Sequence, residues 1–369
     1  MSNPTLRFGI IGLAQSGKTC LFNALTGARL PTGPGAAARE PQPGIVKAPD
    51  QRLEVLAQLF RSEKIVPAEV EFLDFPGSLK AYTREKGSGA GYLSDLAQMD
   101  GLIYVVRAFA QQNVAHELGS VDPWRDLDTL EFELAFADMV LTDRRLERIR
   151  ESAGKVKPQE REAMEKDRGL LSRLKEGLEK GLPLRAQEIS DEEEKALRMY
   201  QLLTLKPVVG VLNIGEEDLS RTFEVEAEAR TRLGRGADSV AVSCQIEMEM
   251  AELAPEEAEE FRASLGIQER PMQRVVRHCH AVTQKIHFLT TGPDETRAWP
   301  VAQGATAQQA AGVIHSDMER GFIRAEVIAW QDLVQCGTLA EARRRGLIRA
   351  EGKTYQVQDG DVINFLFHV

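Results

Sequence analysis

The segment GLAQSGKT, Gly12 to Thr19, decides how the rest of this sequence is interpreted. It matches G-x-x-x-x-G-K-[ST], the phosphate-binding loop, and it stands between a strand predicted for Leu6 to Ile11 and an amphipathic helix carrying Leu21 and Leu25. In such a loop the backbone N–H groups and the helix N-terminus surround phosphate oxygens. The alternative, a flexible glycine turn, does not require this strand and helix context. The sequence therefore predicts a strand-loop-helix unit that binds phosphates.

The loop also assigns individual roles. Lys18 is predicted to neutralise the β- and γ-phosphates and is counted as catalytic, and the Thr19 hydroxyl is predicted to ligate Mg²⁺. The residues expected to contact nucleotide here are Gly12, Gln15, Ser16, Gly17, Lys18, Thr19 and Cys20.

A second motif, VEFLDFPG from Val70 to Gly77, supplies an acidic residue at a strand end. Asp74 is predicted on the magnesium side, and Gly77 is predicted to swing toward a γ-phosphate. A simple Asp-Phe-Pro-Gly turn is the alternative. Ser78 follows Gly77, so the glutamine that orients the attacking water in Ras-type enzymes is missing. Hydrolysis is then slow, or another polar side chain positions the water.

Recognition of the base is predicted at NIGE, Asn213 to Glu216, which follows the apolar run Val208 to Leu212. Ile214 stands where guanine-specific proteins have lysine, and Glu216 stands where they have aspartate, so adenine is at least as well supported as guanine. Asn213, Ile214 and Glu216 are therefore assigned to the nucleotide, with Ser243 closing over the base from the next strand end. A turn at a strand end is the alternative.

Composition restricts the class of protein. The chain has 369 residues, enough for two or three domains, and a formal charge of −10, which excludes a surface that grips nucleic acid over its whole extent. The four cysteines form no C-x-x-C pair, so neither a zinc site nor a disulfide framework is predicted, and a reducing, cytoplasmic location is expected. No apolar run has the length of a membrane span.

Changes in periodicity suggest three parts. Short apolar runs separated by helical patterns predict a buried parallel sheet in residues 1–138 and 200–285. Residues 139–199 alternate charges with a leucine every third or fourth position, which predicts a helical hairpin inserted into that domain. Residues 286–369 return to strand-like patterns and predict a small β-rich domain.

The full length of the chain resembles the Obg-like ATPase family, also called YchF. The most specific stretches are AAGVIHSDMERGFIRAEVI, Ala310 to Ile328, and EGKTYQVQDGDVINFLFHV, Glu351 to Val369. The resemblance implies an α/β P-loop NTPase G domain, interrupted by an α-helical coiled-coil hairpin and followed by a ubiquitin-like β-grasp TGS domain. It also implies binding of ATP, in preference to or alongside GTP, with Mg²⁺, and ribosomes or RNA as partners.

The same resemblance implies that a loop histidine replaces the missing glutamine, and His116 matches it. An imidazole can hydrogen-bond water or accept its proton near neutral pH. Without the resemblance, His116 would be interpreted as a solvated surface residue. The sequence departs from the family at Ala38, where a magnesium-binding threonine is expected, and at Ser78, where an apolar residue is expected. These departures predict a divergent member with weaker Mg²⁺-dependent ordering and slow turnover.

Two functions follow. In the first, ATP or GTP binding biases loops around Ala36 to Gly44 and Gly87 to Gly91, and the protein, a monomer, controls its affinity for the ribosome or RNA. In the second, the chain is a catalytically weak or inactive module with a structural nucleotide. The insertion has 15 basic and 14 acidic residues, so its charge does not oppose RNA binding, and the hairpin and the TGS domain are the surfaces at which RNA is expected to bind. The arginine clusters considered for RNA are Arg144, Arg145 and Arg148, and Arg343 to Arg345; solvated, ion-paired helix faces are the alternative.

Overall fold

The structure is a computed structural model that describes residues 5–33, 40–78, 89–111, 114–152, 158–267 and 269–368. The chain divides into two compact units. The large unit comprises the described residues of Arg7–Gly44 and Phe72–Val282, and the small unit comprises those of Met1–Leu6, Ile45–Glu71 and Thr283–Val369. Among the helices in this described part of the chain, none combines the length and the apolar character needed to cross a bilayer.

A six-stranded sheet with the order β2-β4-β1-β5-β6-β7 carries the phosphate-binding loop. Strands β1, β5, β6 and β7 pair in parallel, as the apolar runs predicted, with Phe8 opposite Gly101 and Leu102 opposite Val208. Strand β2 was not predicted from the sequence. The strands are β1 (Leu6–Ile11), β2 (Gln42–Lys47), β4 (Glu69–Asp74), β5 (Gly101–Ala108), β6 (Val208–Ile214) and β7 (Ala237–Val242).

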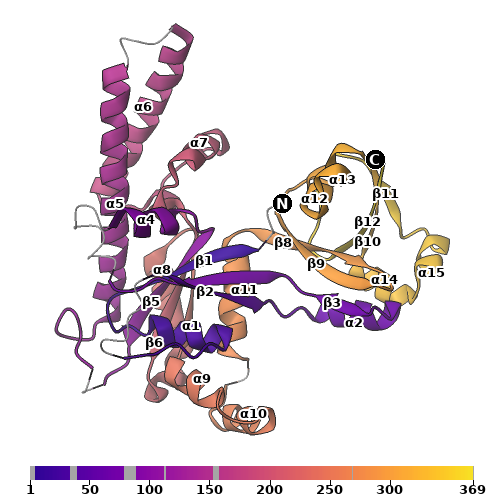
Figure 1. The fold of residues 1–369 in the computed structure, drawn as a ribbon, viewed down its shortest axis with the longest axis horizontal. Coiled ribbons are helices and arrows are strands. Elements are labelled where there is room, and N and C mark those ends of the chain that lie inside the picture. The colour runs from indigo at the N-terminus through magenta and orange to yellow at the C-terminus, as the bar shows by residue number, and fades with distance from the viewer. Residues whose placement is uncertain are drawn as a thin grey trace. The chain divides into compact units, whose positions relative to one another are not determined.

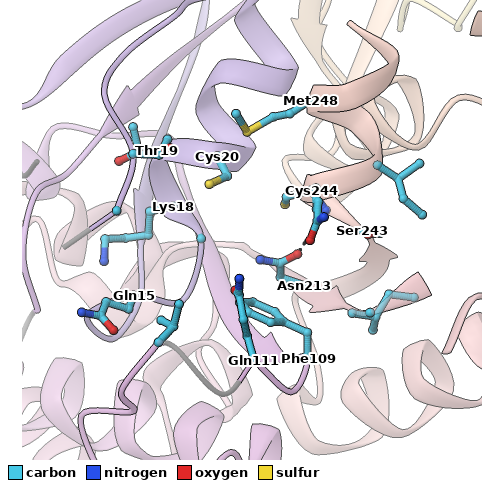
Figure 2. A pocket seen from close by; sticks show the side chains of 18 of the residues that line it. Gln15, Lys18, Thr19, Cys20, Phe109, Gln111, Asn213, Ser243, Cys244 and Met248 are labelled. Atoms are coloured by element: carbon cyan, nitrogen blue, oxygen red, sulfur yellow. Dashed lines mark hydrogen bonds between the residues drawn. The ribbon is translucent and has the colours of Figure 1, made fainter. Parts of the chain in front are cut away.

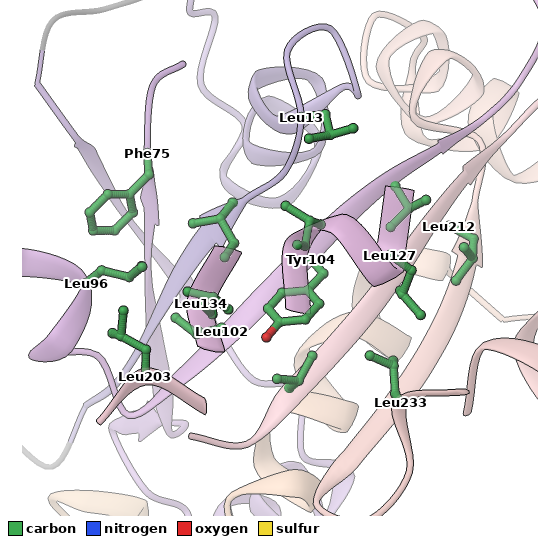
Figure 3. Packing of buried hydrophobic residues seen from close by; sticks show 14 of the residues in the cluster. Leu13, Phe75, Leu96, Leu102, Tyr104, Leu127, Leu134, Leu203, Leu212 and Leu233 are labelled. Atoms are coloured by element: carbon green, nitrogen blue, oxygen red, sulfur yellow. The ribbon is translucent and has the colours of Figure 1, made fainter. Parts of the chain in front are cut away.

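The core of the large unit lies between this sheet and the helices that pack on it. Figure 3 shows Tyr104 from β5 among Leu127, Leu134 and Leu212. All four side chains are at most 1% exposed: Tyr104 and Leu212 come from strands, and Leu127 and Leu134 come from helix α5, which packs on the sheet. The helices of the large unit are α1 (Lys18–Thr26), α4 (Gly89–Ala97), α5 (Pro123–Ser152), α6 (Pro158–Glu179), α7 (Asp191–Leu197), α8 (Thr222–Leu233), α9 (Cys244–Met250), α10 (Pro255–Ser264) and α11 (Pro271–Val282), with short 3-10 turns η1 (Leu184–Ala186), η2 (Arg198–Tyr200), η3 (Leu203–Leu205) and η4 (Glu216–Arg221).

Helices α5 and α6 form the inserted hairpin, which projects from the sheet in Figure 1. Leu146 and Ile149 of α5 pack with Leu171, Leu174 and Leu178 of α6, all of them buried, so the leucine spacing correctly predicted the seam. Helix α5 is one continuous element of 30 residues. It starts on the core of the sheet and continues into the hairpin, without a break where the sequence pattern changes. Ser190 and Glu193 form a capping box at the start of α7.

The small unit holds a second six-stranded sheet, in the order β11-β10-β12-β8-β9-β3. Its last strand comes from far earlier in the chain, because β3 pairs in parallel with β9, with Lys64 opposite Glu295. Arg52 of α2 adds an ion pair with Asp359 at 2.7 Å. The elements are α2 (Gln51–Phe60), β3 (Lys64–Val66), β8 (Lys285–Thr291), β9 (Glu295–Ala302), α12 (Ala307–Ile314), α13 (Ser316–Arg320), β10 (Phe322–Ala329), α14 (Trp330–Cys336), α15 (Leu339–Arg344), β11 (Arg349–Glu351) and β12 (Asp361–Phe367).

The predicted boundaries at 139, 200 and 286 remain predictions. The contacts group the hairpin with the large unit, and they group Ile45–Glu71 with the C-terminal residues. The periodicity of this early segment gave no sign of that grouping, because its partner strand lies more than half the chain away in sequence.

Asp138 fixes helix α5 to the turn η3, and we predict that its loss destabilises the protein. Its buried carboxylate accepts hydrogen bonds from Leu203 N at 2.8 Å and from Thr204 N and Thr204 Oγ1 at 2.8 and 2.7 Å. Asp138→Ala leaves three buried donors unpaired and should lower the free energy of unfolding by about 3 kcal/mol. Urea unfolding followed by fluorescence measures this loss.

The control for this experiment is Asp143→Ala on the same helix. Asp143 contacts Lys175 at 2.6 Å, but its side chain is 56% exposed, so its loss should cost less than about 1 kcal/mol. Equal destabilisation by the two substitutions would contradict the assigned role of Asp138.

Candidate functional site

A cavity of about 920 Å³ opens at the ends of the parallel strands. This edge is where open α/β sheets bind ligands, because the loops that follow the strands converge there. Figure 2 shows Lys18, Thr19, Asn213 and Ser243 around the cavity. Of the residues assigned to nucleotide or metal from the sequence, those lining the cavity are Gln15, Gly17, Lys18, Thr19, Cys20, Asp74, Gly77, Asn213, Ile214, Glu216 and Ser243.

Gly12 and Ser16 belong to the loop but do not line the cavity. The two motif glycines, Gly12 and Gly17, lie so close to neighbouring atoms that a side chain would not fit. A Cβ on Gly12 would lie 2.4 Å from Val105 O, and a Cβ on Gly17 would lie 2.2 Å from Asn213 Nδ2. Gly17 also has a φ of 102°, which other residues rarely adopt. The glycines therefore hold the loop against the strands β5 and β6.

Lys18 is folded onto its own loop. Its Nζ donates to Gly12 O at 3.1 Å and to Leu13 O at 2.9 Å, and the residue is 8% exposed. Burial lowers the pKa of Lys18 from 10.5 to about 8, against the opposing effect of the negative charges on Asp74 and Glu117. A bound phosphate would supply the counter-charge that this buried ammonium requires.

Thr19 and Asp74 lie together, as the magnesium prediction requires. Thr19 Oγ1 donates to Asp74 Oδ2 at 2.7 Å, while Asp74 Oδ1 is buried and has no hydrogen-bond partner within the described part of the chain. Burial raises the pKa of Asp74, and the Thr19 hydroxyl and the charge of Lys18 oppose that rise. A hydroxyl and a carboxylate oxygen suit Mg²⁺, which takes its remaining ligands from water and phosphate oxygens. These two residues would hold the ion, which when bound neutralises phosphate charge.

Asn213 ties two loops together. Its Nδ2 donates to Ser16 O at 3.1 Å, and its Oδ1 accepts from Cys244 N at 3.1 Å. The side chain therefore fixes the phosphate-binding loop to the start of α9. A contact with the base would have to use the second N–H of Nδ2 or the second lone pair of Oδ1. Ile214 is 2% exposed and also belongs to the hydrophobic core, whereas Glu216 is exposed at the start of η4.

His116 does not line the cavity. Its Nε2 lies 2.7 Å from Asp126 Oδ2, its Nδ1 accepts from Leu118 N at 3.1 Å, and its side chain is 4% exposed. Both ring nitrogens are therefore engaged within the protein. A catalytic role for His116 would require these two hydrogen bonds to break, and it stays a prediction.

In the loop after β5 the sequence reasoning assigned only His116 and missed the four residues that line the cavity, Phe109, Ala110, Gln111 and Val114. Arg107 fixes this loop. Its buried guanidinium donates to the carbonyl oxygens of Phe109, Gln111, Val114 and Ala115 at 3.1 to 3.4 Å and lies 4.6 Å from the centre of the Phe109 ring. An arginine at the end of an otherwise apolar strand is the signal that could have indicated it.

Parts of the predicted switch loops lie outside the described residues. These parts are 36–39, which includes Ala38, and 87–88. Ser78, the other departure, is described, and its Oγ donates to Glu117 Oε1 at 3.2 Å. A polar contact thus replaces the apolar residue that the resemblance implies at that position.

The lowered pKa of Lys18 predicts how ATP binding depends on pH. A phosphate raises this pKa in the complex, so affinity is greatest below about pH 8 and weakens as the pH rises through that value, by up to about tenfold per unit. Fluorescence titrations with ATP between pH 7 and 9.5 measure the trend. Lys18→Arg, which stays charged, should show weaker but pH-independent binding, and a flat wild-type profile would contradict the prediction.

Comparisons with known proteins agree with this geometry. Residues 7–133 match the family described as 50S ribosome-binding GTPase, and residues 285–368 match the C-terminal family of YchF GTPases, which is described as being of unknown function. The chain is 39% identical to the Ribosome-binding ATPase YchF of Bacillus subtilis (strain 168) over 369 residues, which is 99% of this chain and 100% of that protein. It is 34% identical to the Obg-like ATPase 1 of Oryza sativa subsp. japonica, over 99% and 92% of the two chains.

The fold agrees as well. The structure of the Schizosaccharomyces pombe YchF GTPase matches with a TM-score of 0.83 at 28% identity, over 99% of this chain and 98% of that one. This confirms the predicted α/β P-loop domain with a helical insertion and a C-terminal β-rich, TGS-like domain. Because the identity extends over nearly the whole length, the chain belongs to the YchF, or Obg-like ATPase, family of P-loop NTPases.

Proposed function

We propose that the chain binds ATP with Mg²⁺ at this cavity, hydrolyses it slowly, and uses the nucleotide state to control binding to the ribosome or its RNA. The observation that carries the proposal is the arrangement of Lys18, Thr19 and Asp74, in which one buried carboxylate oxygen of Asp74 has no hydrogen-bond partner among the described residues. Buried polar atoms normally have partners, so this oxygen supports a cation as the missing one. Several relatives carry the name Ribosome-binding ATPase.

ATP is the proposed nucleotide and GTP the alternative. Guanine selectivity in this class of proteins depends on an aspartate that accepts from the base and a lysine that packs beside it. Here Ile214 is apolar and largely buried in the core, and Glu216 is exposed at the start of a 3-10 turn. An exposed glutamate held by a turn is a poor substitute for a fixed carboxylate, since water competes for its hydrogen bonds.

The slow rate follows from the residues near the terminal phosphate. Gly77 lines the cavity and has a φ of 74°, the left-handed conformation that only glycine adopts easily, so the turn after Asp74 is built for close backbone approach. No glutamine follows it, and His116 is engaged elsewhere. In this conformation neither a glutamine after Gly77 nor the ring of His116 is placed to orient the attacking water.

Turnover by the pure protein tests the enzyme proposal. With Mg²⁺ and ATP we expect slow release of phosphate that is lost in Lys18→Ala, because the lysine neutralises charge on the transferred group. The dissociation constant for ATP should be lower than that for GTP; a tenfold preference for GTP, about 1.4 kcal/mol, would overturn the choice of ATP. Intact binding without turnover would instead support the inactive nucleotide-bound module, and weakened binding after Mg²⁺ removal by EDTA would support the metal.

The proposed partner is the ribosome, reached through the hairpin and the TGS-like domain of a cytoplasmic monomer. The two arginine clusters differ in how far ion pairs neutralise their charge. Arg343, Arg344 and Arg345 pair with Glu326 or Glu341, so much of their charge is neutralised. In the hairpin cluster Arg145 pairs with Asp167 at 3.6 Å, whereas Arg144 and Arg148 are exposed on α5 and, within the described residues, no ion pair involves them. The hairpin cluster is therefore the better candidate for phosphate contacts.

Salt dependence tests this assignment. Binding to ribosomes should weaken steeply with salt, and Arg144→Ala with Arg148→Ala should lower the slope of log K against log salt by about 1 to 2, because each phosphate contact releases counterions. The matched control is Arg344→Ala with Arg345→Ala, which should leave the slope nearly unchanged. Cosedimentation with ribosomes at several salt concentrations measures both, and a flat wild-type response would remove the role of the hairpin.

A further inference from the structure

The ring of His116 is held in one tautomer by two hydrogen bonds within the protein. Leu118 N donates to Nδ1 at 3.1 Å, so this nitrogen carries no proton. The ring proton is therefore on Nε2, which donates to Asp126 Oδ2 at 2.7 Å. The side chains of His116 and Asp126 are 4% and 3% exposed, so water competes little for this bond. A ring held in this way has no nitrogen to offer to an attacking water.

The carboxylate of Asp126 also has cationic neighbours. Its Oδ1 accepts from Arg125 Nε at 3.1 Å and from Arg125 Nη2 at 2.8 Å. Burial lowers the pKa of Arg107, and the negative charge of Asp126 opposes that effect. Asp126 therefore keeps partners for its charge when the imidazole leaves, and a buried carboxylate with a partner is far less costly than an isolated one. The contact with His116 can open without leaving an unpaired charge.

The segment that carries His116 reaches the edge of the nucleotide site. The next residue, Glu117, accepts from Ala14 N at 2.9 Å, and Ala14 lines the cavity. Gly119 follows, exposed and with a φ of 86°, the left-handed conformation that glycine adopts without strain. The backbone of His116 is thus adjacent to a residue bound to the phosphate-binding loop, and Gly119 can take up changes in backbone torsion nearby.

We propose that the hydrogen bond between His116 and Asp126 is an autoinhibitory contact, in which Asp126 is the positioning residue that keeps the imidazole away from the attacking water. This inference rests on the proposed hydrolysis of ATP and on the role expected for His116. The ring exchanges between a closed position on Asp126 and an open position at the cavity, and only the open position orients water. The basal rate is then the rate of the open form multiplied by its population, which the contact with Asp126 keeps small.

The proposal fixes the direction in which Asp126 acts. A carboxylate that supports a histidine as a base, as the buried aspartate of a catalytic triad does, slows the reaction when it is removed. A carboxylate that holds the ring away from the water speeds the reaction when it is neutralised. ATP affinity should change little in either case, because other residues hold the nucleotide. The sign of the change in rate therefore decides between the two roles.

The first experiment measures single-turnover ATP hydrolysis and ATP dissociation constants for the full chain and its variants. Asp126→Asn keeps the shape but removes the charge that strengthens the hydrogen bond, so the rate should rise about three- to tenfold, with the dissociation constant within about twofold of wild type. In a His116→Ala background, which should be slower than wild type, Asp126→Asn should produce no rise, because it acts through that ring.

The matched control is Asp122→Asn, which removes the same charge just before the start of α5. Asp122 Oδ1 accepts from Arg125 N at 3.1 Å, and an asparagine can accept the same hydrogen bond. This substitution should leave the rate unchanged. A rise equal to that of Asp126→Asn would show that loosening the start of the helix is sufficient, which would overturn the role of Asp126.

A second experiment detects the contact without any turnover. In protein that carries isotope-labelled histidine, nitrogen NMR distinguishes the two tautomers of a ring, and the signals of His116 are those lost in His116→Ala. The wild type should show one tautomer, with the proton on Nε2, whereas Asp126→Asn should shift these signals toward those of free imidazole, which exchanges between tautomers. Mixed tautomers in the wild type would overturn the proposal, and this measurement decides even where a variant fails to fold.

The outcomes separate this inference from the proposed function. If the wild type hydrolyses ATP and Asp126→Asn hydrolyses it at the same rate or more slowly, the autoinhibitory contact is overturned while the ATPase proposal stands. A rise that persists in the His116→Ala background also overturns it, since the effect does not pass through the ring. If neither the wild type nor Asp126→Asn hydrolyses ATP, the proposed hydrolysis fails, and the inference that rests on it fails as well.

Discussion

The side-chain amide of Asn213 is the contact on which the geometry of the nucleotide site depends. It donates to the carbonyl of Ser16 in the phosphate-binding loop and accepts from the backbone of Cys244 at the start of α9. The amide is 5% exposed, so the loss of either bond would leave polar groups buried without partners. It also explains the second glycine of the motif, because any Cβ on Gly17 would collide with Nδ2. A sheet edge, a loop and a helix N-terminus are thereby held in one arrangement.

A second fixed point is the guanidinium of Arg107, which supports the other wall of the cavity. Its donors satisfy carbonyl groups of the described residues that follow β5. The chain then reaches His116 and Glu117, whose side chains point to different partners: Asp126 in the first turn of α5, and the amide of Ala14. The anchor of this loop is therefore the same helix that continues into the hairpin.

Several parts of this arrangement could be predicted from local sequence. The phosphate-binding motif requires a strand before it and a helix after it, and β1 and α1 are where the motif requires them. The apolar runs that became β5 and β6 are buried on both faces, so their composition alone was sufficient. The leucine spacing of the hairpin followed the helical period, and the Ser190 capping box was readable because its hydrogen bonds are local. Strand β2 was missed because Pro43 and Gly44 interrupt its alternation of apolar and polar residues. Strand β3 was missed because a strand of three residues is too short to show that alternation.

The sequence by itself determined that this chain folds around the loop of a P-loop NTPase and that a charged helical hairpin interrupts the domain. Those properties depend on neighbours in the chain, whose spacing is written in the sequence. The tertiary structure decided the rest: that Asn213 binds the phosphate-binding loop, that His116 contacts Asp126 while Glu117 binds the amide of Ala14, and that β3 completes a sheet made otherwise from the C-terminal residues. Each of these depends on groups brought together from distant positions, and the direction of a single side chain is set by such partners.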